Sequence, residues 1–193
     1  MEEVLHVEGL SVAIDTPGGS LRAVSDVDLH VGRGETLCIV GESGCGKTMT
    51  SLGIMGLLPR RARLSARRLA LEGRDLLALS AGERAALRGN RMAMIFQDPM
   101  TSLNPVYTVG NQMMEIFLRH NKGGRSEARE RAEYLLQKVG ITAARSRLGQ
   151  YPHQLSGGLR QRVMVAMALM CDPILMIADE PTTALDVTIQ AQI

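Results

Sequence analysis

The sequence is poor in aromatic residues: among its 193 residues it has no tryptophan, three tyrosines and two phenylalanines. Proteins that bind single-stranded nucleic acid stack bases on aromatic side chains, and this sequence offers no obvious platform for such stacking. Positive charge is not in large excess either, because 22 Lys and Arg residues oppose 20 Asp and Glu residues. We therefore expect no nucleic acid as a partner.

Cysteines and long apolar runs are also scarce. Cys38, Cys45 and Cys171 are odd in number and lack metal-ligand spacing, so we expect free thiols in a reducing cytoplasm. No apolar run approaches the roughly 18 residues that cross a bilayer. The acidic N-terminus, MEEVLHVEGL, lacks the basic start and apolar core of a secretory signal. These features predict a globular chain that does not itself span the membrane.

The strands are predicted from apolar patterning. Apolar and polar residues alternate over residues 26–31, as in a half-buried antiparallel strand. TLCIV (residues 36–40) is continuously apolar and predicts a fully buried strand, as do residues 91–96 and 174–180. A shorter strand is expected at residues 69–71.

The remaining segments predict helices. TMTSLGIMGLL after the glycine-rich loop predicts a helix that Pro59 stops. Ser80 and Glu83 have the spacing of a capping box. Residues 106–149 have a helical pattern that residues 121–124 interrupt. Mixed strands, then helices, then a strand predict an α/β core with a helical insertion.

A phosphate-binding loop is predicted at GESGCGKT, residues 41–48, which matches G-x-x-x-x-G-K-[ST]. Glycines let backbone amides surround phosphate oxygens, Lys47 reaches the outer phosphates and the Thr48 hydroxyl ligates Mg²⁺. The predicted ATP-binding residues are Gly41, Glu42, Ser43, Gly44, Cys45, Gly46, Lys47, Thr48 and Gln97.

Two acids end the strand ILMIADE. Neighbouring side chains on a strand point to opposite faces, so Asp179 and Glu180 can divide their roles only if the chain turns, as Pro181 suggests. Asp179 would then hold the Mg²⁺ shell, and Glu180 would polarise an attacking water. Gln97 also ends a strand and can reach a metal or a water. From these residues alone, a solvated acidic turn and a turn-capping amide remain alternatives.

A second candidate anion site opens the helix after LSGG. Ser156, Gly157 and Gly158 leave backbone amides bare at a helix N-terminus, where the helix dipole favours an anion. A plain N-cap is the alternative reading of these three residues.

Five motifs in this order carry a resemblance to a known family. They are GESGCGKT (Walker A), Gln97 (Q-loop), LSGGLRQR (signature), ILMIADE (Walker B) and ALD at residues 184–186 (D-loop). The sequence resembles the ATP-binding subunit of an ABC transporter. The residues that surround the motifs, such as FQDPMTSLNPVYTVGNQ, resemble those of the oligopeptide/dipeptide/nickel branch of bacterial importers.

The resemblance implies a P-loop NTPase core of the ABC ATPase type, with an N-terminal antiparallel β-subdomain and a helical insertion. Residues 1–193 would form one such domain, with residues 1–98 and 171–193 as the nucleotide-binding core and 99–170 as the helical subdomain. In the family a further strand follows and ends at a switch histidine, so we expect this chain to be a fragment that is incomplete at its C-terminus.

The resemblance also implies how the two anion sites are used. Two ATPase domains pair head to tail, and Ser156, Gly157 and Gly158 of one subunit close over the ATP held by the other. Asp186 would cross the same interface. Glu180 is the implied catalytic residue. The implied Mg²⁺ ligands are Thr48, Gln97 and, through water, Asp179.

The implied function is ATP hydrolysis that powers peptide import from the cytoplasmic face of the cell membrane. The implied partners are a second ATPase subunit, identical or homologous, two transmembrane permease subunits and, indirectly, an extracytoplasmic solute-binding protein. Two alternatives stay open: a soluble ABC ATPase acting on nucleic acid, and a binding-only subunit that is inactive because it has no switch histidine. The sequence does not name the transported solute.

Overall fold

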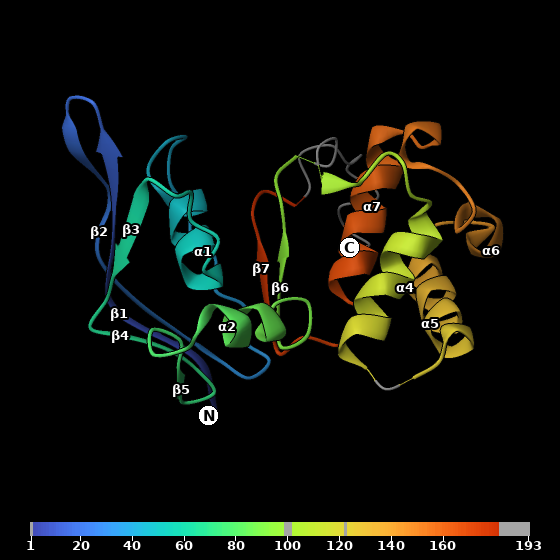
Figure 1. Cartoon of the computed structure of the whole chain (residues 1–193), viewed down its shortest axis with the longest axis horizontal. Coiled ribbons are helices and arrows are strands. Elements are labelled where there is room, and N and C mark those ends of the chain that lie inside the picture. Colours follow the sequence, from blue (N-terminus) through green and yellow to red (C-terminus); the bar gives the residue numbers. More distant parts are fainter. Residues whose placement is uncertain (1, 99–101, 122, 182–193) are drawn as a thin grey trace. The chain divides into compact units, whose positions relative to one another are not determined.

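The structure is a computed structural model that describes residues 2–98, 102–121 and 123–181. The chain divides into two compact units, residues 1–88 and residues 89–193 (Figure 1). The N-terminal unit contains the predicted phosphate loop. The C-terminal unit contains Gln97, the two acids and the signature residues. We describe each unit by itself.

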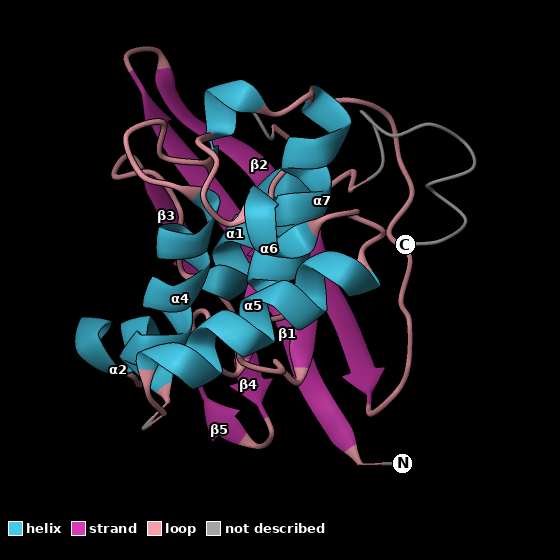
Figure 2. Ribbon diagram, turned by 90° about the vertical axis from the view of Figure 1, so that its right-hand side faces the viewer, coloured by secondary structure: helices cyan, strands magenta, loops and turns pink. Residues whose placement is uncertain are grey.

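A five-stranded antiparallel sheet forms most of the N-terminal unit. Its strands are β1 (Glu3–Thr16), β2 (Gly19–Gly32), β3 (Ala62–Ser65), β4 (Arg68–Leu71) and β5 (Arg74–Asp75). Figure 2 shows β1 and β2 as long paired strands. β3 and β4 pair with β1, and β5 pairs with β4. The predicted N-terminal antiparallel subdomain is confirmed.

The two faces of this sheet differ in polarity, because successive side chains along a strand point to opposite faces. On β1, Leu10 and Val12 are completely buried, and on β2 the predicted alternation leaves Leu29 half-buried between exposed neighbours. The exposed Asp26 and Asp28 bind the guanidinium group of Arg67 at 2.7 and 3.0 Å. One face of the sheet therefore packs inward while the other presents charge to solvent.

Helix α1 (Lys47–Met55) packs against β1 and follows the phosphate loop directly. A Cβ added at Gly53 would lie 3.1 Å from Leu64 and 3.6 Å from Val12, so this glycine lets the helix approach the sheet closely. The helix ends at Gly56, whose φ of 64° provides a left-handed C-cap. The prediction that Pro59 ends the helix was wrong, because Gly56 stops it three residues earlier.

The predicted buried strand at residues 36–40 was wrong. These residues form no strand, and Leu37, Ile39 and Val40 are 45, 50 and 92 % exposed. A buried parallel strand needs neighbours to pair with its amide and carbonyl groups. No described strand pairs with this segment, so its apolar composition alone does not produce a strand.

Helix α2 (Ala81–Leu87) begins with the predicted capping box. The Ser80 hydroxyl oxygen accepts from the Glu83 amide at 3.3 Å, and the Glu83 carboxylate accepts from the Ser80 amide at 2.9 Å. That amide, and then the Ser80 hydroxyl, lower the pKa of Glu83. Both halves of the predicted motif are confirmed.

The C-terminal unit contains a parallel pair of strands, β6 (Met92–Ile95) and β7 (Leu175–Ala178). Figure 1 shows β6 and β7 side by side. Met92 is opposite Leu175, and Ile95 is opposite Ala178. The two strands therefore end at the same edge, and Gln97 and Asp179 follow close behind.

Helices form the rest of this unit. They are α4 (Val109–His120), α5 (Arg125–Lys138), α6 (Ala144–Arg147), the short 3₁₀ helix η1 (Pro152–Gln154) and α7 (Gly157–Ala168). Val109, Met113, Leu136 and Val163 are buried between α4, α5 and α7. The predicted helical region is confirmed, and so is its interruption at the described residues Asn121, Gly123 and Gly124. In the described part of the chain, no helix has the length and apolar character needed to cross a membrane.

Candidate nucleotide site

The phosphate loop is shaped by glycines with left-handed backbone. Gly44 has φ 83°, and Gly46, the N-cap of α1, has φ 102°. A Cβ at Gly46 would lie 2.7 Å from the Ala23 carbonyl oxygen, so a side chain is excluded there by contact as well as by conformation. Since Gly46 has no side chain to cap the helix, the first turn of α1 is available to an anion.

Lys47 folds back over this loop. Its Nζ donates to the carbonyl oxygens of Gly41 at 2.7 Å and Glu42 at 2.8 Å, and lies 3.8 Å from Cys45 Sγ. The ammonium group is thereby held within the loop, and the loop itself is exposed. A cation positioned among glycines at a helix N-terminus is suited to bind phosphate.

The two acidic residues that follow β7 differ in their burial. Asp179 is 7 % exposed, and its amide donates to the Ile95 carbonyl at 3.0 Å, which extends the pairing with β6. Glu180 is exposed and has φ 49°, so the chain does turn here, as predicted. The Gln97 amide Nε2 donates to Glu180 Oε2 at 2.8 Å. The structure thus brings Gln97 and Glu180 into contact, a pairing that the sequence alone did not indicate.

The signature residues open α7. Ser156 is its N-cap, and the Ser156 hydroxyl oxygen accepts from the Leu159 amide at 3.4 Å. A Cβ at Gly157 would meet nothing within 4 Å, so this end of the helix is open to an incoming group. The N-cap reading is confirmed, and it is compatible with the predicted second role. Binding of a partner's ATP by Ser156, Gly157 and Gly158 stays a prediction.

Gln161 is a functional candidate that the sequence analysis missed. It is completely buried within α7, and its Nε2 donates to the carbonyl oxygen of Pro181, the residue after Glu180. In the sequence, Gln161 stands between two arginines, and the only signal was its position four residues before the buried Val165 on the same helix. Asp186 of the predicted D-loop lies outside the described residues.

Each compact unit contains a candidate Mg²⁺ ligand of a type that Mg²⁺ accepts. The described residues contain no group of three or more His, Cys, Asp or Glu side chains that could hold a metal alone. Mg²⁺ in nucleotide sites needs less protein, because one or two carboxylates complement phosphate oxygens and water. The Thr48 hydroxyl and the Asp179 carboxylate are hard oxygen donors of this kind.

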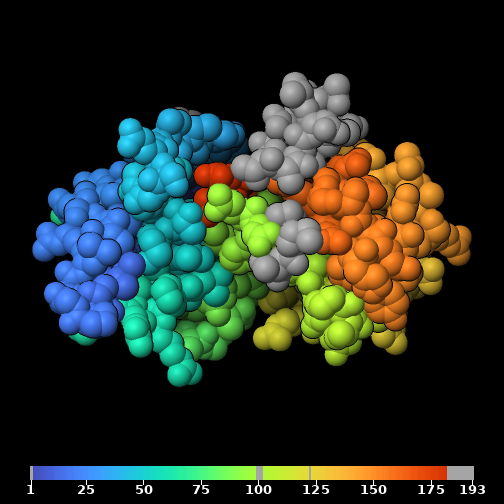
Figure 3. All heavy atoms as spheres, turned by 90° about the horizontal axis from the view of Figure 1, so that it is seen from above, coloured from blue at the N-terminus to red at the C-terminus, as the bar shows by residue number. Residues whose placement is uncertain are grey.

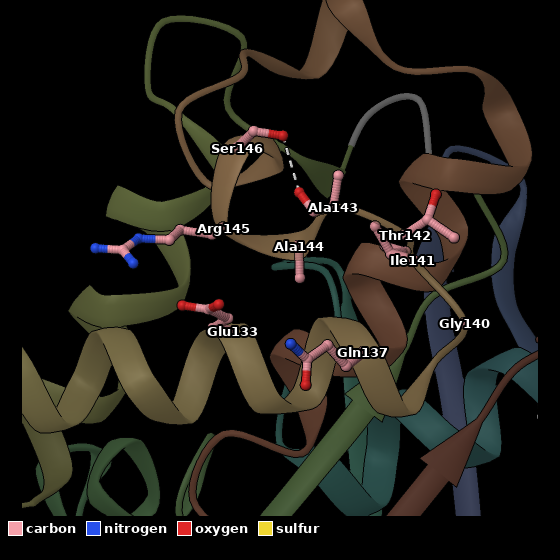
Figure 4. A pocket seen from close by; sticks show the side chains of 9 residues that line it. All are labelled: Glu133, Gln137, Gly140, Ile141, Thr142, Ala143, Ala144, Arg145 and Ser146. Atoms are coloured by element: carbon pink, nitrogen blue, oxygen red, sulfur yellow. Dashed lines mark hydrogen bonds between the residues drawn. The ribbon is translucent and has the colours of Figure 1, made fainter.

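A hollow lies between α5 and α6 in the C-terminal unit. It has a volume of about 730 Å³ and includes Glu133, Gln137 and Arg145 on its rim (Figure 4). A second hollow contains Cys171, where burial raises the pKa of the thiol. None of the predicted ATP-binding, catalytic or signature residues lines either hollow.

Curated relatives align with the whole of this chain. It is 54 % identical to the dipeptide transport ATP-binding protein DppD of Bacillus subtilis (strain 168), over 100 % of this chain and 58 % of the relative. It is 51 % identical to the oligopeptide transport ATP-binding protein OppD of the same organism, over 98 % of this chain and 53 % of OppD. The chain thus spans less than two thirds of the length of these relatives.

Solved structures have the same fold. The dimeric bacterial ABC transporter cassette MJ0796 has a TM-score of 0.86 at 24 % identity, over 97 % of this chain and 78 % of that one. The structure of cbiO1 from Clostridium perfringens, part of the ABC transporter complex cbiONQ, has a TM-score of 0.76 at 25 % identity, over 100 % of this chain and 71 % of the other. These matches confirm the predicted α/β fold of the ABC ATPase type.

The family model described as ABC transporter matches residues 24–183. The matched segment includes the phosphate loop, Gln97, the signature residues and both acids of the β7 strand end. Because the family model matches most of the chain, this chain belongs to the ABC transporter family.

Proposed function

We propose that the protein is the ATP-binding and ATP-hydrolysing subunit of an ABC importer that takes up peptides. The observation that carries the proposal is the contact of Gln97 with Glu180. It places a carboxylate and an amide together after the carboxyl ends of two parallel strands, which is where α/β proteins bind their ligands. The dipeptide and oligopeptide transport relatives support peptides as the solute class.

In the proposed reaction, Lys47 exchanges its carbonyl partners for phosphate oxygens of ATP. Thr48 and, through water, Asp179 would hold Mg²⁺, which would supply positive charge to neutralise the phosphates. Glu180 accepts a hydrogen bond from the attacking water and polarises it. Gln97 holds the Glu180 carboxylate in one orientation and is a further candidate ligand for the metal.

The proposed assembly is a head-to-tail pair of ATPase subunits. Ser156, Gly157 and Gly158 of each subunit would close over the other's ATP, and Asp186 would cross the interface. The pair would act from the cytoplasmic face of the membrane on two permease subunits, with an extracytoplasmic binding protein that delivers the peptide. Closure and reopening of the pair would drive uptake. The division into a core and a helical subdomain at residues 99–170 remains part of this proposal.

Two substitutions test the catalytic assignment. In the naturally encoded protein with its permeases, Glu180→Gln should bind ATP normally but turn it over at least about 100-fold more slowly, because it lacks a general base. Lys47→Ala should abolish ATP binding. The readouts are equilibrium nucleotide binding and phosphate release. Glu115→Gln, the same change at an exposed residue of α4, is the matched control and should behave as wild type.

Normal turnover by Glu180→Gln would disprove the mechanism. ATP binding without turnover by the wild-type protein, even with its partners present, would support the binding-only alternative. Uptake of labelled di- and oligopeptides in a deletion strain tests the solute class. Stimulation of turnover by DNA or RNA instead of by permeases would contradict import.

A further inference from the structure

Three hydrogen bonds from separate parts of the C-terminal unit meet at residues 179–181. The Asp179 amide donates to Ile95 of β6, the Glu180 carboxylate accepts from Gln97, and the Pro181 carbonyl accepts from Gln161 of α7. Between the two backbone contacts, Glu180 has a φ of 49°, which a residue with a side chain seldom adopts. Such backbone persists only where its surroundings hold it.

Packing alone does not account for an amide at position 161. Gln161 is 0 % exposed, and its Oε1 has no hydrogen-bond partner among the described residues. A buried amide with one unsatisfied end is less favourable than an apolar side chain of similar size. The other end of the amide, Nε2, makes the contact with Pro181. We attribute the presence of glutamine to this donor.

We infer that Gln161 is a positioning residue that holds the turn carrying Glu180 and joins it to the signature helix. The inference rests on the proposed function, in which Glu180 is the catalytic residue. Gln161 lies five residues after Ser156, about 7.5 Å along the helix axis at 1.5 Å per residue. A displacement of the N-terminus of α7 is therefore transmitted to the turn at residues 179–181 through the first turns of the helix and the hydrogen bond from Gln161 to Pro181.

The test is Gln161→Met in the naturally encoded protein with its permeases. Methionine has a similar size but cannot donate to Pro181. We expect kcat for ATP to fall about ten- to a hundredfold, the scale of a small misplacement of a catalytic group, while KM for ATP stays within about twofold. Amide exchange in the peptide spanning residues 175–181 should become faster. Gln137→Met makes the same change at an exposed position of α5 and should alter neither quantity.

Wild-type kcat or unchanged exchange in Gln161→Met would overturn the inference. A lower unfolding temperature with unchanged kcat per folded molecule would also overturn it, because it would assign Gln161 a structural role alone. A wild-type protein that does not hydrolyse ATP would refute the proposed function. In that case, faster amide exchange in Gln161→Met would still support the hydrogen bond from Gln161 as the contact that holds the turn. Failure of the proposed function and failure of this inference are therefore distinguishable.

Discussion

At the scale of single residues, position in the fold separates the cysteines. Cys38 and Cys45 are exposed, and Cys45 lies in the phosphate loop beside the ammonium group of Lys47. Cys171 is partly buried, and its desolvation raises the pKa of its thiol. Because only the thiolate attacks an alkylating reagent, these environments predict different reaction rates.

Iodoacetamide should therefore modify Cys38 and Cys45 well before Cys171, and the reaction at Cys171 should gain most from a rise in pH. ATP should slow modification of Cys45, because the nucleotide covers its loop, and leave Cys38 unaffected. Mass spectrometry of a time course measures all three rates in one sample, with Cys38 as the internal control. Equal protection of both residues, or of neither, would contradict ATP binding at this loop.

At the scale of elements, two glycines occupy the second position of their helices in different surroundings. A Cβ at Gly110 of α4 would lie 2.8 Å from the Leu148 carbonyl oxygen, whereas a Cβ at Gly82 of α2 would meet nothing within 4 Å. Gly110→Ala should reduce the free energy of unfolding by about 1–3 kcal/mol through overpacking. Gly82→Ala should raise it by about 0.5–1 kcal/mol, because alanine loses less entropy in a helix.

Urea unfolding followed by circular dichroism measures both changes. The paired design controls for helix propensity, since each variant replaces a glycine with alanine at the same helical position. If Gly110→Ala were as stable as wild type, α4 would not be held against the segment at Leu148 as the structure describes.

The helical region and strand β2 could be predicted from periodicity, and β6 and β7 from short apolar runs. The capping box of α2 was likewise readable from Ser80 and Glu83. The conformation of residues 36–40 could not be predicted, because an apolar run indicates burial but does not identify the strands that would pair with it. Of the site, the residue types and spacing predicted Gln97 and Glu180 separately. Their contact, and the tether from Gln161, depend on how β6, β7 and α7 pack, which no local pattern encodes.

At the scale of the molecule, the predicted site residues are divided between the two units. The N-terminal unit contains the loop that would bind ATP, and the C-terminal unit contains the acids and the signature helix. The family match extends across both units. Under the proposed function, a variant that destabilises the N-terminal unit is expected to weaken nucleotide binding first, and one that destabilises the C-terminal unit is expected to slow turnover first.

The exposed segment at residues 36–40 has a consequence for the behaviour of the 193-residue chain in solution. TLCIV is uncharged, contains no proline and is rich in β-forming residues, and the light-blue region around it lies at the surface in Figure 3. Short segments of this composition add to one another as intermolecular strands. We expect the chain to form thioflavin-T-positive aggregates as its concentration rises.

Ile39→Lys should delay this self-association, because a charge interrupts the run, whereas Leu21→Lys, at an exposed position of β2, should not. The measurement is the aggregation half-time of each variant. Equal half-times would show that a segment other than residues 36–40 drives self-association.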